Sequence, residues 1–202
     1  MFKLFTAKNL LFTLALTLMA VGQGFALTCS GSPKTCQISS CQDLHDFSDS
    51  TNVVKFSLNS HPNVGWNAKV TQPIDMADCK DGNGNIKPFT PIASKDVVLN
   101  AYSGTFDGQG FPISNLNIVG SENTQYVGMF AGLQSGGVIK NLVLENISIS
   151  ASKDKGWAID PTVGSVVGFM HGSSSVVQNC YVSGTVVATG ERSTVGGIVG
   201  KI

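Results

Sequence analysis

The sequence repeats itself, and this repeat limits the possible folds more than any other feature. A six-residue segment that begins with Val-Gly and ends with Gly occurs three times, at residues 127–132, 163–168 and 195–200. A second segment, which ends in an asparagine followed by Leu or Cys, recurs at 112–116, 138–142 and 176–180. Recurrence of this kind is typical of architectures built from stacked supersecondary units.

Apolar and polar residues alternate after the asparagines. Between 142 and 149 the apolar side chains fall on one face and the polar ones on the other, and Asn146 lies where a turn lets the alternation restart. A period of two, with β-branched residues and with Gly, Asn and Ser between the runs, predicts short β-strands. No stretch beyond residue 26 has a convincing helical period, so we expect an all-β chain.

A unit made of a few short strands cannot bury its own apolar face and must stack on its neighbours. A propeller is the alternative, but its blades need four strands in roughly 40–50 residues, and the repeats here are shorter and unequally spaced. We therefore predict a right-handed parallel β-helix, or β-solenoid, with glycines at corners of positive φ. The expected parts are a signal peptide at 1–26, a cysteine-rich capping segment at 27–60, the first coils at 61–126, and repeats at 127–202, the last of them incomplete.

Stacking places equivalent side chains above one another. Asn115, Asn141 and Asn179 occupy one position of the second segment, which predicts either an asparagine ladder between coils or three independent turn residues. Cys180 aligns with a leucine in each of the other two segments. We therefore expect Cys180 to be a free, unreactive thiol in the core.

The first 26 residues have the three parts of a secretory signal peptide. Two lysines come first, an uncharged run follows at 10–21, and small residues precede the expected cleavage after Ala26. The apolar run is shorter than the ~20 residues that span a bilayer, and the residues before Cys29 make a poor lipoprotein signal. We expect a secreted or surface location, with no transmembrane segment after cleavage.

Export permits disulfides, and the chain has five cysteines. No Cys-x-x-Cys pair or Cys/His cluster indicates zinc. Because five is an odd number, one cysteine has no partner within the chain. We expect this cysteine to be Cys180, whose position in the repeat points inward. We expect the other four cysteines to form two disulfide bridges, in one of three possible connectivities. These four are Cys29, Cys36, Cys41 and Cys79.

The charge composition argues against a nucleic-acid partner. Basic and acidic residues balance at 13 each, and Arg192 is the only arginine. A chain with no net positive charge and one arginine lacks the groups that usually read phosphates and bases.

These motifs resemble the GLUG repeats of bacterial surface proteins, in which Val-Gly-Gly-Ile-Val-Gly-type units precede a Gly-x-Ile-x-Asn strand. The stretch 102–118 is similar to the coil that leads into such repeats, and 70–76 resembles a strand of the family that ends in Asp-Ile-Asp. The stretch 89–92 resembles its Trp-x-Pro-Ile, with Phe89 in place of the tryptophan. The likeness covers most of 41–202. It implies an adhesin-like, filamentous-haemagglutinin-like β-helix at a cell surface and carries over no catalytic residues.

Motifs for catalysis and metal binding are weak. The three histidines lie far apart without the His-Glu-x-x-His pattern of zinc peptidases, and no Gly-x-Ser-x-Gly elbow is present. Asp107 stands in a sequence typical of a tight Asp-Gly turn. The oxygen-rich run 75–85 favours a Gly/Asn turn over a calcium loop, because the closing glutamate is missing. We expect no enzyme activity, no metal and no cofactor.

The strongest candidate ligand site is the longest insertion between repeats. Asp154 and Asp160 flank Trp157, an arrangement in which a sugar stacks on the indole and the carboxylates accept bonds from its hydroxyls; a solvated loop is the alternative. The predicted function is an exported, adhesin-like interaction module that binds an unknown surface glycan or protein. Two alternatives stay open: the N-terminal part of a longer surface enzyme, of the immunoglobulin-A-protease type, and a carbohydrate-active β-helix.

The last repeat offers no polar cap. A solenoid with a bare terminal coil exposes apolar core and unpaired strand edges, and the apolar residues at 195, 198, 199 and 202 do not cover them. The sequence therefore predicts either a truncated fragment of a longer protein or self-association through the last coil.

Overall fold

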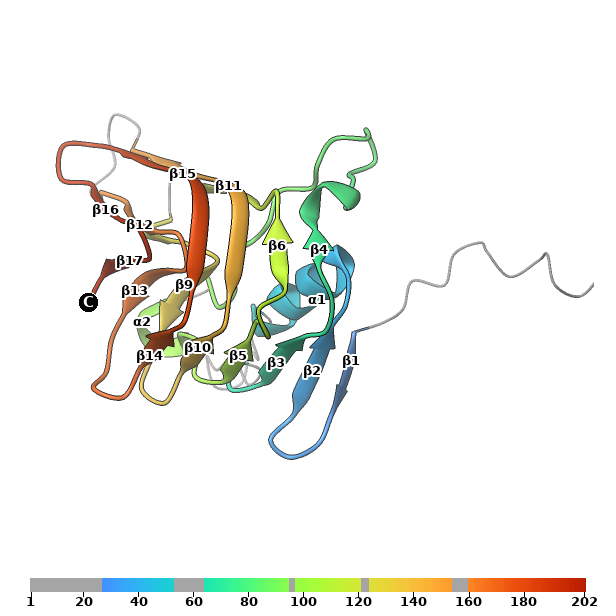
Figure 1. Cartoon of the computed structure of the whole chain (residues 1–202). Helices are drawn as coiled ribbons and strands as arrows, with labels where there is room; N and C mark the ends of the chain where they lie inside the picture. Colours follow the sequence, from blue (N-terminus) through green and yellow to red (C-terminus); the bar gives the residue numbers. More distant parts are fainter. Residues whose placement is uncertain (1–26, 53–63, 95–96, 121–123, 154–159) are drawn as a thin grey trace, which may run out of the picture.

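The computed structural model describes residues 27–52, 64–94, 97–120, 124–153 and 160–202, which form a β-solenoid of about 4 turns. Figure 1 shows β1, β2 and α1 at one end of the solenoid and β14 to β17, with the C-terminus, at the other. Each turn, here called a rung, pairs in parallel with the rungs before and after it. The prediction of a short parallel β-helix with a cysteine-containing N-terminal segment is confirmed.

The four rungs share one plan of short strands separated by corners. Rung 1 contributes β3 (Asn67–Val70), β4 (Ile74–Asp75), the 3-10 helix η1 (Met76–Asp78) and α2 (Val97–Asn100). Rung 2 contributes β5 (Thr105–Asp107), β6 (Pro112–Ser114), β7 (Asn117–Gly120), β8 (Tyr126–Val127) and β9 (Phe130–Leu133). Rung 3 contributes β10 (Val138–Lys140), β11 (Val143–Ser152), β12 (Thr162–Gly164) and β13 (Val167–Met170). Rung 4 contributes β14 (Val176–Gln178), β15 (Tyr181–Thr189), β16 (Thr194–Gly196) and β17 (Val199–Lys201).

The Val-Gly segments stack in register, as the repeat predicts. Val163 pairs with Val127 in rung 2 and with Val195 in rung 4. The strands form a six-stranded sheet, β1-β2-β3-β5-β10-β14, and a five-stranded sheet, β15-β11-β6-β4 with β7 beside β11. Two three-stranded sheets, β16-β12-β8 and β17-β13-β9, complete the wall.

One part of the sequence alignment is wrong. Segment 112–116 was expected above 138–142, but β6 pairs with the start of β11, so that Ile113 lies opposite Leu144. The strand beside β10 in rung 2 is β5. Pairing of β6 with β10 and pairing of β6 with β11 both place the apolar residues of the strands inward. The alternation of apolar and polar residues therefore did not distinguish the expected pairing from the observed one.

The core runs along the inside of the solenoid. Apolar side chains of the N-terminal segment and of rungs 1 to 3 form one buried cluster, and apolar side chains of rung 4 pack against it but are only partly buried. Its aromatic centre joins Phe106 and Phe130, whose rings lie 5.2 Å apart, to Tyr102, at 5.1 Å from Phe130. The Tyr102 hydroxyl donates to the carbonyl of Trp66 at 2.7 Å, so that its polar end is satisfied inside the core.

A helix that the sequence analysis missed closes the N-terminal end. Helix α1 (Cys41–Thr51) begins at Ser40, whose side chain accepts from the backbone N–H of Asp43 at 3.1 Å. Leu44 and Phe47 are fully buried against the solenoid core. The periodicity was too weak to indicate this helix, because it has few large apolar residues on its buried face.

The cysteines pair as two bridges among the four that were predicted. Cys29 bonds to Cys36, joining the antiparallel strands β1 (Thr28–Ser30) and β2 (Thr35–Ile38). Cys41 bonds to Cys79 and ties α1 to rung 1. Cys180 is a free cysteine, as predicted, but it is only half-buried, because it lies in the last rung.

Candidate functional site

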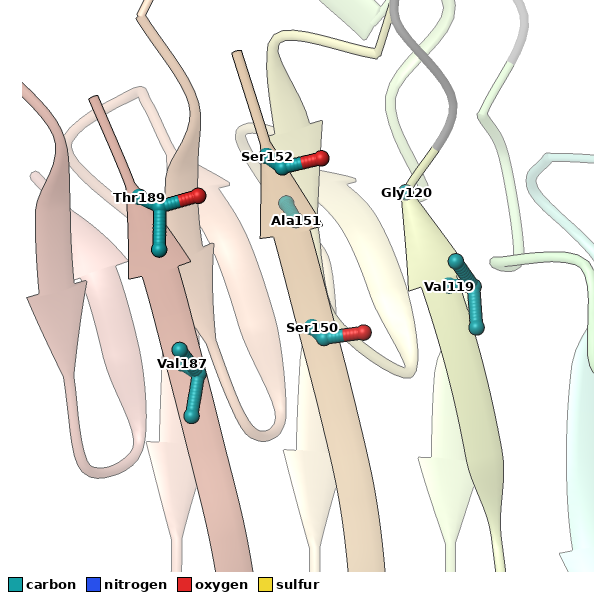
Figure 2. Close-up of a pocket in the computed structure, with 7 residues that line it drawn as sticks. All are labelled: Val119, Gly120, Ser150, Ala151, Ser152, Val187 and Thr189. Atoms are coloured by element: carbon teal, nitrogen blue, oxygen red, sulfur yellow. The ribbon is translucent and has the colours of Figure 1, made fainter. Parts of the chain in front are cut away.

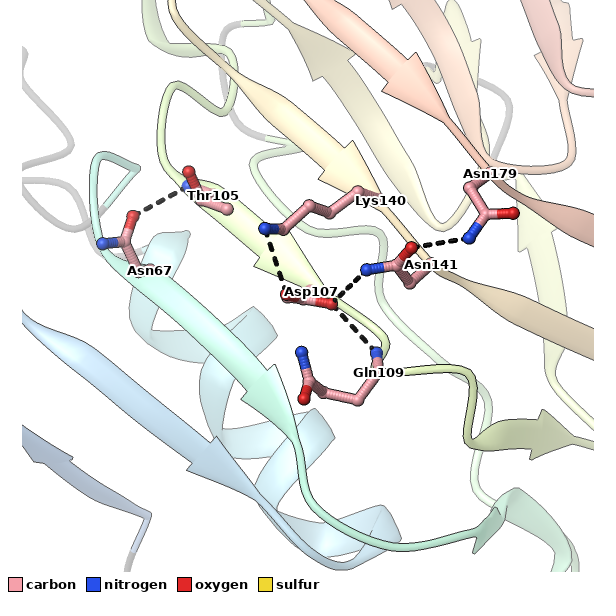
Figure 3. Close-up of polar contacts among 7 residues, drawn as sticks. All are labelled: Asn67, Thr105, Asp107, Gln109, Lys140, Asn141 and Asn179. Atoms are coloured by element: carbon pink, nitrogen blue, oxygen red, sulfur yellow. Dashed lines mark hydrogen bonds and ion pairs between the residues drawn. The ribbon is translucent and has the colours of Figure 1, made fainter.

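A column of amide and carboxylate side chains runs along the corner between the six-stranded and five-stranded sheets (Figure 3). The Nδ2 of Asn179 donates to Oδ1 of Asn141 at 2.6 Å, and the Nδ2 of Asn141 donates to Oδ1 of Asp107 at 3.0 Å. Both asparagines have left-handed backbone, with φ of 51° and 52°, a conformation that asparagine adopts more readily than most residues. Each asparagine therefore forms the corner and links two rungs.

Asp107 ends this ladder in rung 2. Its Oδ1 also accepts from the backbone N–H of Gln109 at 3.0 Å, which forms the predicted turn, and its Oδ2 lies 3.2 Å from Nζ of Lys140. Burial alone would raise the pKa of the Asp107 carboxyl, but hydrogen bonds from Asn141 and Gln109 and the contact with Lys140 outweigh it and lower the pKa to about 2. Both oxygens are engaged within the protein, so the carboxylate has a structural role.

Replacing Asp107 by asparagine is expected to lower the free energy of unfolding at neutral pH by about 1–2 kcal/mol, because the carboxylate is more stabilised in the fold than in the unfolded chain. A depressed folded-state pKa gives stability that is present above about pH 4 and is lost as the pH falls through about 2. The difference between wild type and Asp107→Asn should therefore shrink between pH 5 and pH 2 in urea unfolding experiments. The exposed Asp78, changed to Asn, is the control; an equal pH dependence in both variants would contradict the assignment.

A second ladder runs along the outer face near β4 and β6. The Nδ2 of Asn146 donates to Oδ1 of Asn115 at 2.6 Å, and the Nδ2 of Asn115 donates to Oδ1 of Asp75 at 2.7 Å. Hydrogen bonds, first from Asn115 and then from the backbone N–H of Ala77, lower the pKa of Asp75. This ladder has the same direction as the first and also ends in an aspartate.

The single column predicted for Asn115, Asn141 and Asn179 is therefore wrong for Asn115. Asn141 and Asn179 are bonded as expected, whereas Asn115 belongs to the second ladder. The reason is that residues 108–111 separate β5 from β6, while the shorter pair 141–142 separates β10 from β11. The sequence analysis also missed the aspartates at which the two ladders end. An aspartate at a corner, one rung before an asparagine at the equivalent corner, could have indicated them.

The predicted sugar site is described only in part. Asp154 and Trp157 lie outside the described residues. Asp160 has an ion pair with Lys153 at 3.2 Å and a longer one with Arg192 at 3.8 Å. Burial opposes ionisation of Asp160, but the contact with the Lys153 side chain, a hydrogen bond from the backbone N–H of Arg192 and the two positive charges outweigh it and lower the pKa of Asp160. The described part of this loop thus shows Asp160 joining rungs 3 and 4.

A shallow hollow opens on the outer face of the five-stranded sheet, where β7 ends beside the longer β11 (Figure 2). Its volume is about 230 Å³, smaller than the roughly 300–1,000 Å³ of pockets for drug-sized ligands. Val119 lies opposite Ser150, which in turn lies opposite Val187. The remaining lining residues are Gly120, Ala151, Ser152 and Thr189. The hollow therefore combines apolar surface with hydroxyls and has no charged group in its lining.

The shape of the hollow follows from local sequence. A Cβ on Gly120 would lie 2.8 Å from a methyl of Val127 and 2.9 Å from the Cβ of Ala151, so a larger residue at this strand end would have to displace these side chains. In Figure 2 the hydroxyls of Ser150 and Ser152 point toward β7, across the space beside Gly120. Val119 is 63% exposed and Val187 is 42% exposed, so an apolar surface is available on both sides of these hydroxyls.

The turn at 81–85 is organised by its own backbone. Asp81 accepts through Oδ1 from the backbone N–H groups of Asn83 and Asn85, at 2.8 and 2.9 Å, and a bridge between Lys80 and Ile86 closes it. The prediction of a Gly/Asn turn is confirmed. Within the described ranges, no three His, Cys, Asp or Glu side chains come together as metal ligands, and no helix there has the length and hydropathy to cross a membrane.

Comparison with known proteins shows a similarity to part of a very long protein. The chain is 30% identical over 182 residues to halomucin of Haloquadratum walsbyi, an alignment that covers 88% of this chain and 2% of halomucin. The chain thus spans about 2% of the length of this curated relative. No family model matches the chain, and no solved structure matches it, so the resemblance to GLUG repeats stays a prediction. What the comparisons add to the geometry is that nearly the whole solenoid is similar to a small part of a very large protein.

Proposed function

We propose that this chain is an exported, non-catalytic interaction module of a cell surface, which binds a neutral glycan in the hollow on the five-stranded sheet. The similarity to part of halomucin and the β-solenoid fold support a surface-associated module. The proposed GLUG-type repeats and signal peptide agree with this location.

The observation that carries the proposal is the chemistry of the hollow. Ser150, Ser152 and Thr189 offer hydroxyls that both donate and accept hydrogen bonds, while Val119 and Val187 offer apolar surface next to them. A sugar ring has this same combination of hydroxyls and apolar C–H faces. An anionic or cationic ligand would lose hydration without gaining an ion pair, because the lining has no charge.

The absence of catalysis is supported by how the acids are used. Asp107, Asp75 and Asp160 are each held by hydrogen bonds or ion pairs with neighbouring protein groups. Glycoside hydrolysis needs two carboxyl groups facing a shared substrate, one of them with a raised pKa. The carboxylates of Asp75, Asp107 and Asp160 have lowered pKa values instead.

The test is a screen of the purified chain against neutral glycans, followed by titration calorimetry with the best ligand. Ser150→Arg fills the hollow with a charged side chain and should weaken binding at least tenfold. Gln37→Arg, at an exposed position of β2, is the matched control and should bind like wild type. Unchanged affinity in Ser150→Arg would refute the site. Shortened glycan recovered after incubation would refute the non-catalytic assignment.

A further inference from the structure

Helix α1 carries a buried histidine. His45 is only 2% exposed, and the centroid of its ring lies 5.4 Å from that of Phe89, in the segment between η1 and α2. Its Nε2 is buried and has no hydrogen-bond partner among the described residues. A neutral imidazole carries one N–H, whereas an imidazolium carries two and a positive charge. Protonation of His45 therefore puts a charge and a second donor in a buried place where Nε2 finds no acceptor.

The charged groups that act on His45 come from two elements. Asp46 and Asp49, on α1 itself, favour the protonated ring, and Lys87, on the segment opposite, disfavours it. Burial has the largest influence, and together with Lys87 it holds the pKa of His45 below its ordinary value of about 6.5. The backbone N–H of Lys87 donates to the carbonyl of Cys79 at 2.8 Å, which fixes this segment beside the helix. His45 is therefore neutral in the folded protein near pH 7.

The two ends of α1 are held differently. The Cys41–Cys79 disulfide ties the start of the helix covalently to rung 1. Near its end, hydrogen bonds join the helix to the segment 90–94; the hydroxyl of Ser48, for example, donates to the carbonyl of Thr90 at 2.6 Å. His45 lies four residues after Cys41, on the same side of the helix. A charge on His45 therefore acts on the hydrogen-bonded part of α1, while the disulfide keeps the start in place.

The part of α1 beyond His45 covers the aromatic centre of the core. Phe47 is fully buried, and its ring lies 6.2 Å from those of Tyr102 and Phe106. We propose that α1 is an acid-released cover: protonation of His45 frees the helix beyond the disulfide and opens the aromatic centre of the core, and deprotonation closes it again. The device is independent of the glycan site, which lies on the outer face of the five-stranded sheet.

The pH window of this release follows from the two states of His45. In the released helix the ring is solvated and titrates near its ordinary pKa of about 6.5, while in the closed helix its pKa is lower. The closed state is therefore fully favoured above about pH 6.5, and its advantage falls as the pH drops from there to the folded-state pKa. Over this interval the equilibrium constant for opening α1 should rise by up to about tenfold for each pH unit.

Hydrogen exchange of the full chain, measured by mass spectrometry from about pH 7.5 to about pH 5 and corrected for the intrinsic exchange rate, tests the proposal. Peptides from 42–52 should lose protection as the pH falls and regain it when the pH is restored, while peptides from β11 and β12 keep theirs. His45→Leu has no proton to gain at this position and should remove the pH dependence; His45→Gln takes its place if the leucine variant does not fold. Lys87→Gln should lessen the acid sensitivity, because loss of this positive charge raises the folded-state pKa of His45. His171→Gln, outside α1, is the matched control and should behave like wild type.

Four results would count against this device. Protection of α1 that does not change with pH overturns the proposal. Equal loss of protection in all rungs overturns it too, because the whole solenoid would then unfold rather than its cover. An unchanged pH dependence in the His45 variants overturns the assignment to His45, and a Lys87→Gln variant as acid-sensitive as wild type overturns the influence of Lys87.

Discussion

Changing Gly164 to alanine is expected to lower the free energy of unfolding by at least about 3 kcal/mol. A Cβ at this position would lie closer than 3.0 Å to the carbonyl oxygens of Val167 and Ile198 and to the backbone nitrogen of Gly200. All three are backbone atoms: Val167 lies in β13, Gly200 lies in β17, and the carbonyl of Ile198, just before β17, accepts from the backbone N–H groups of rung 3. They therefore cannot move aside as a side chain would. Overpacking that cannot relax is among the most destabilising kinds of substitution.

The control lies in the equivalent Val-Gly segment of rung 4, residues 195–200. A Cβ on Gly197 would meet nothing within 4 Å, so Gly197→Ala should change the free energy of unfolding by less than about 0.5 kcal/mol. Guanidinium unfolding of both variants, followed by circular dichroism, measures the difference. If both variants lowered the free energy of unfolding by similar amounts, the close approach of the backbone around Gly164 would not be the reason that glycine is needed there.

Removing the Cys41–Cys79 disulfide is expected to cost about 4 kcal/mol, because its loop spans a sequence separation of 38. The bond holds the start of α1 against rung 1, and α1 covers the end of the core. Without it, α1 and the residues it buries, Leu44 and Phe47, should lose protection from hydrogen exchange before the later rungs do. The variant is the double change of both cysteines to alanine.

The other bridge is the matched comparison. Cys29 and Cys36 close a separation of only 7, for which the same relation gives about 2 kcal/mol. Denaturant unfolding should rank the two double variants in this order. The reverse order would show that the Cys41–Cys79 bond does not secure the capping helix. In wild type, mass mapping should find both bridges and recover Cys180 alkylated.

The repeat in the sequence predicted the fold because one physical requirement acts on every rung. Positions such as 127, 163 and 195 must each place a valine inward, so their pattern survives in the sequence and gives the correct register. The register of Asn115 failed for an equally physical reason. Rung 3 has two corners at which an asparagine has positive φ, Asn141 and Asn146. Because one rung can carry this asparagine at two corners, the asparagine alone does not identify which corner it marks.

Other features left no periodic signal. Helix α1 depends on Ser40 at its start and on a few buried residues that contact rungs far along the chain, among them Phe47 near Phe106. The hollow depends on where β7 ends relative to β11, and no repeated pattern in the sequence marks that position. The choice among three disulfide connectivities likewise depends on three-dimensional positions, which spacing alone does not specify.

The direction of the two ladders has a consequence for how the solenoid assembles. In each ladder the later rung is the donor and the earlier rung is the acceptor, back to an aspartate that only accepts. The asparagine of a completed rung therefore has a free side-chain oxygen that can accept a hydrogen bond from the asparagine of the next rung. No hydrogen bond that has already formed needs to exchange its donor and acceptor when a rung is added. Growth that starts at the disulfide-bonded N-terminal end can proceed one rung at a time, in the order in which the rungs follow one another along the chain.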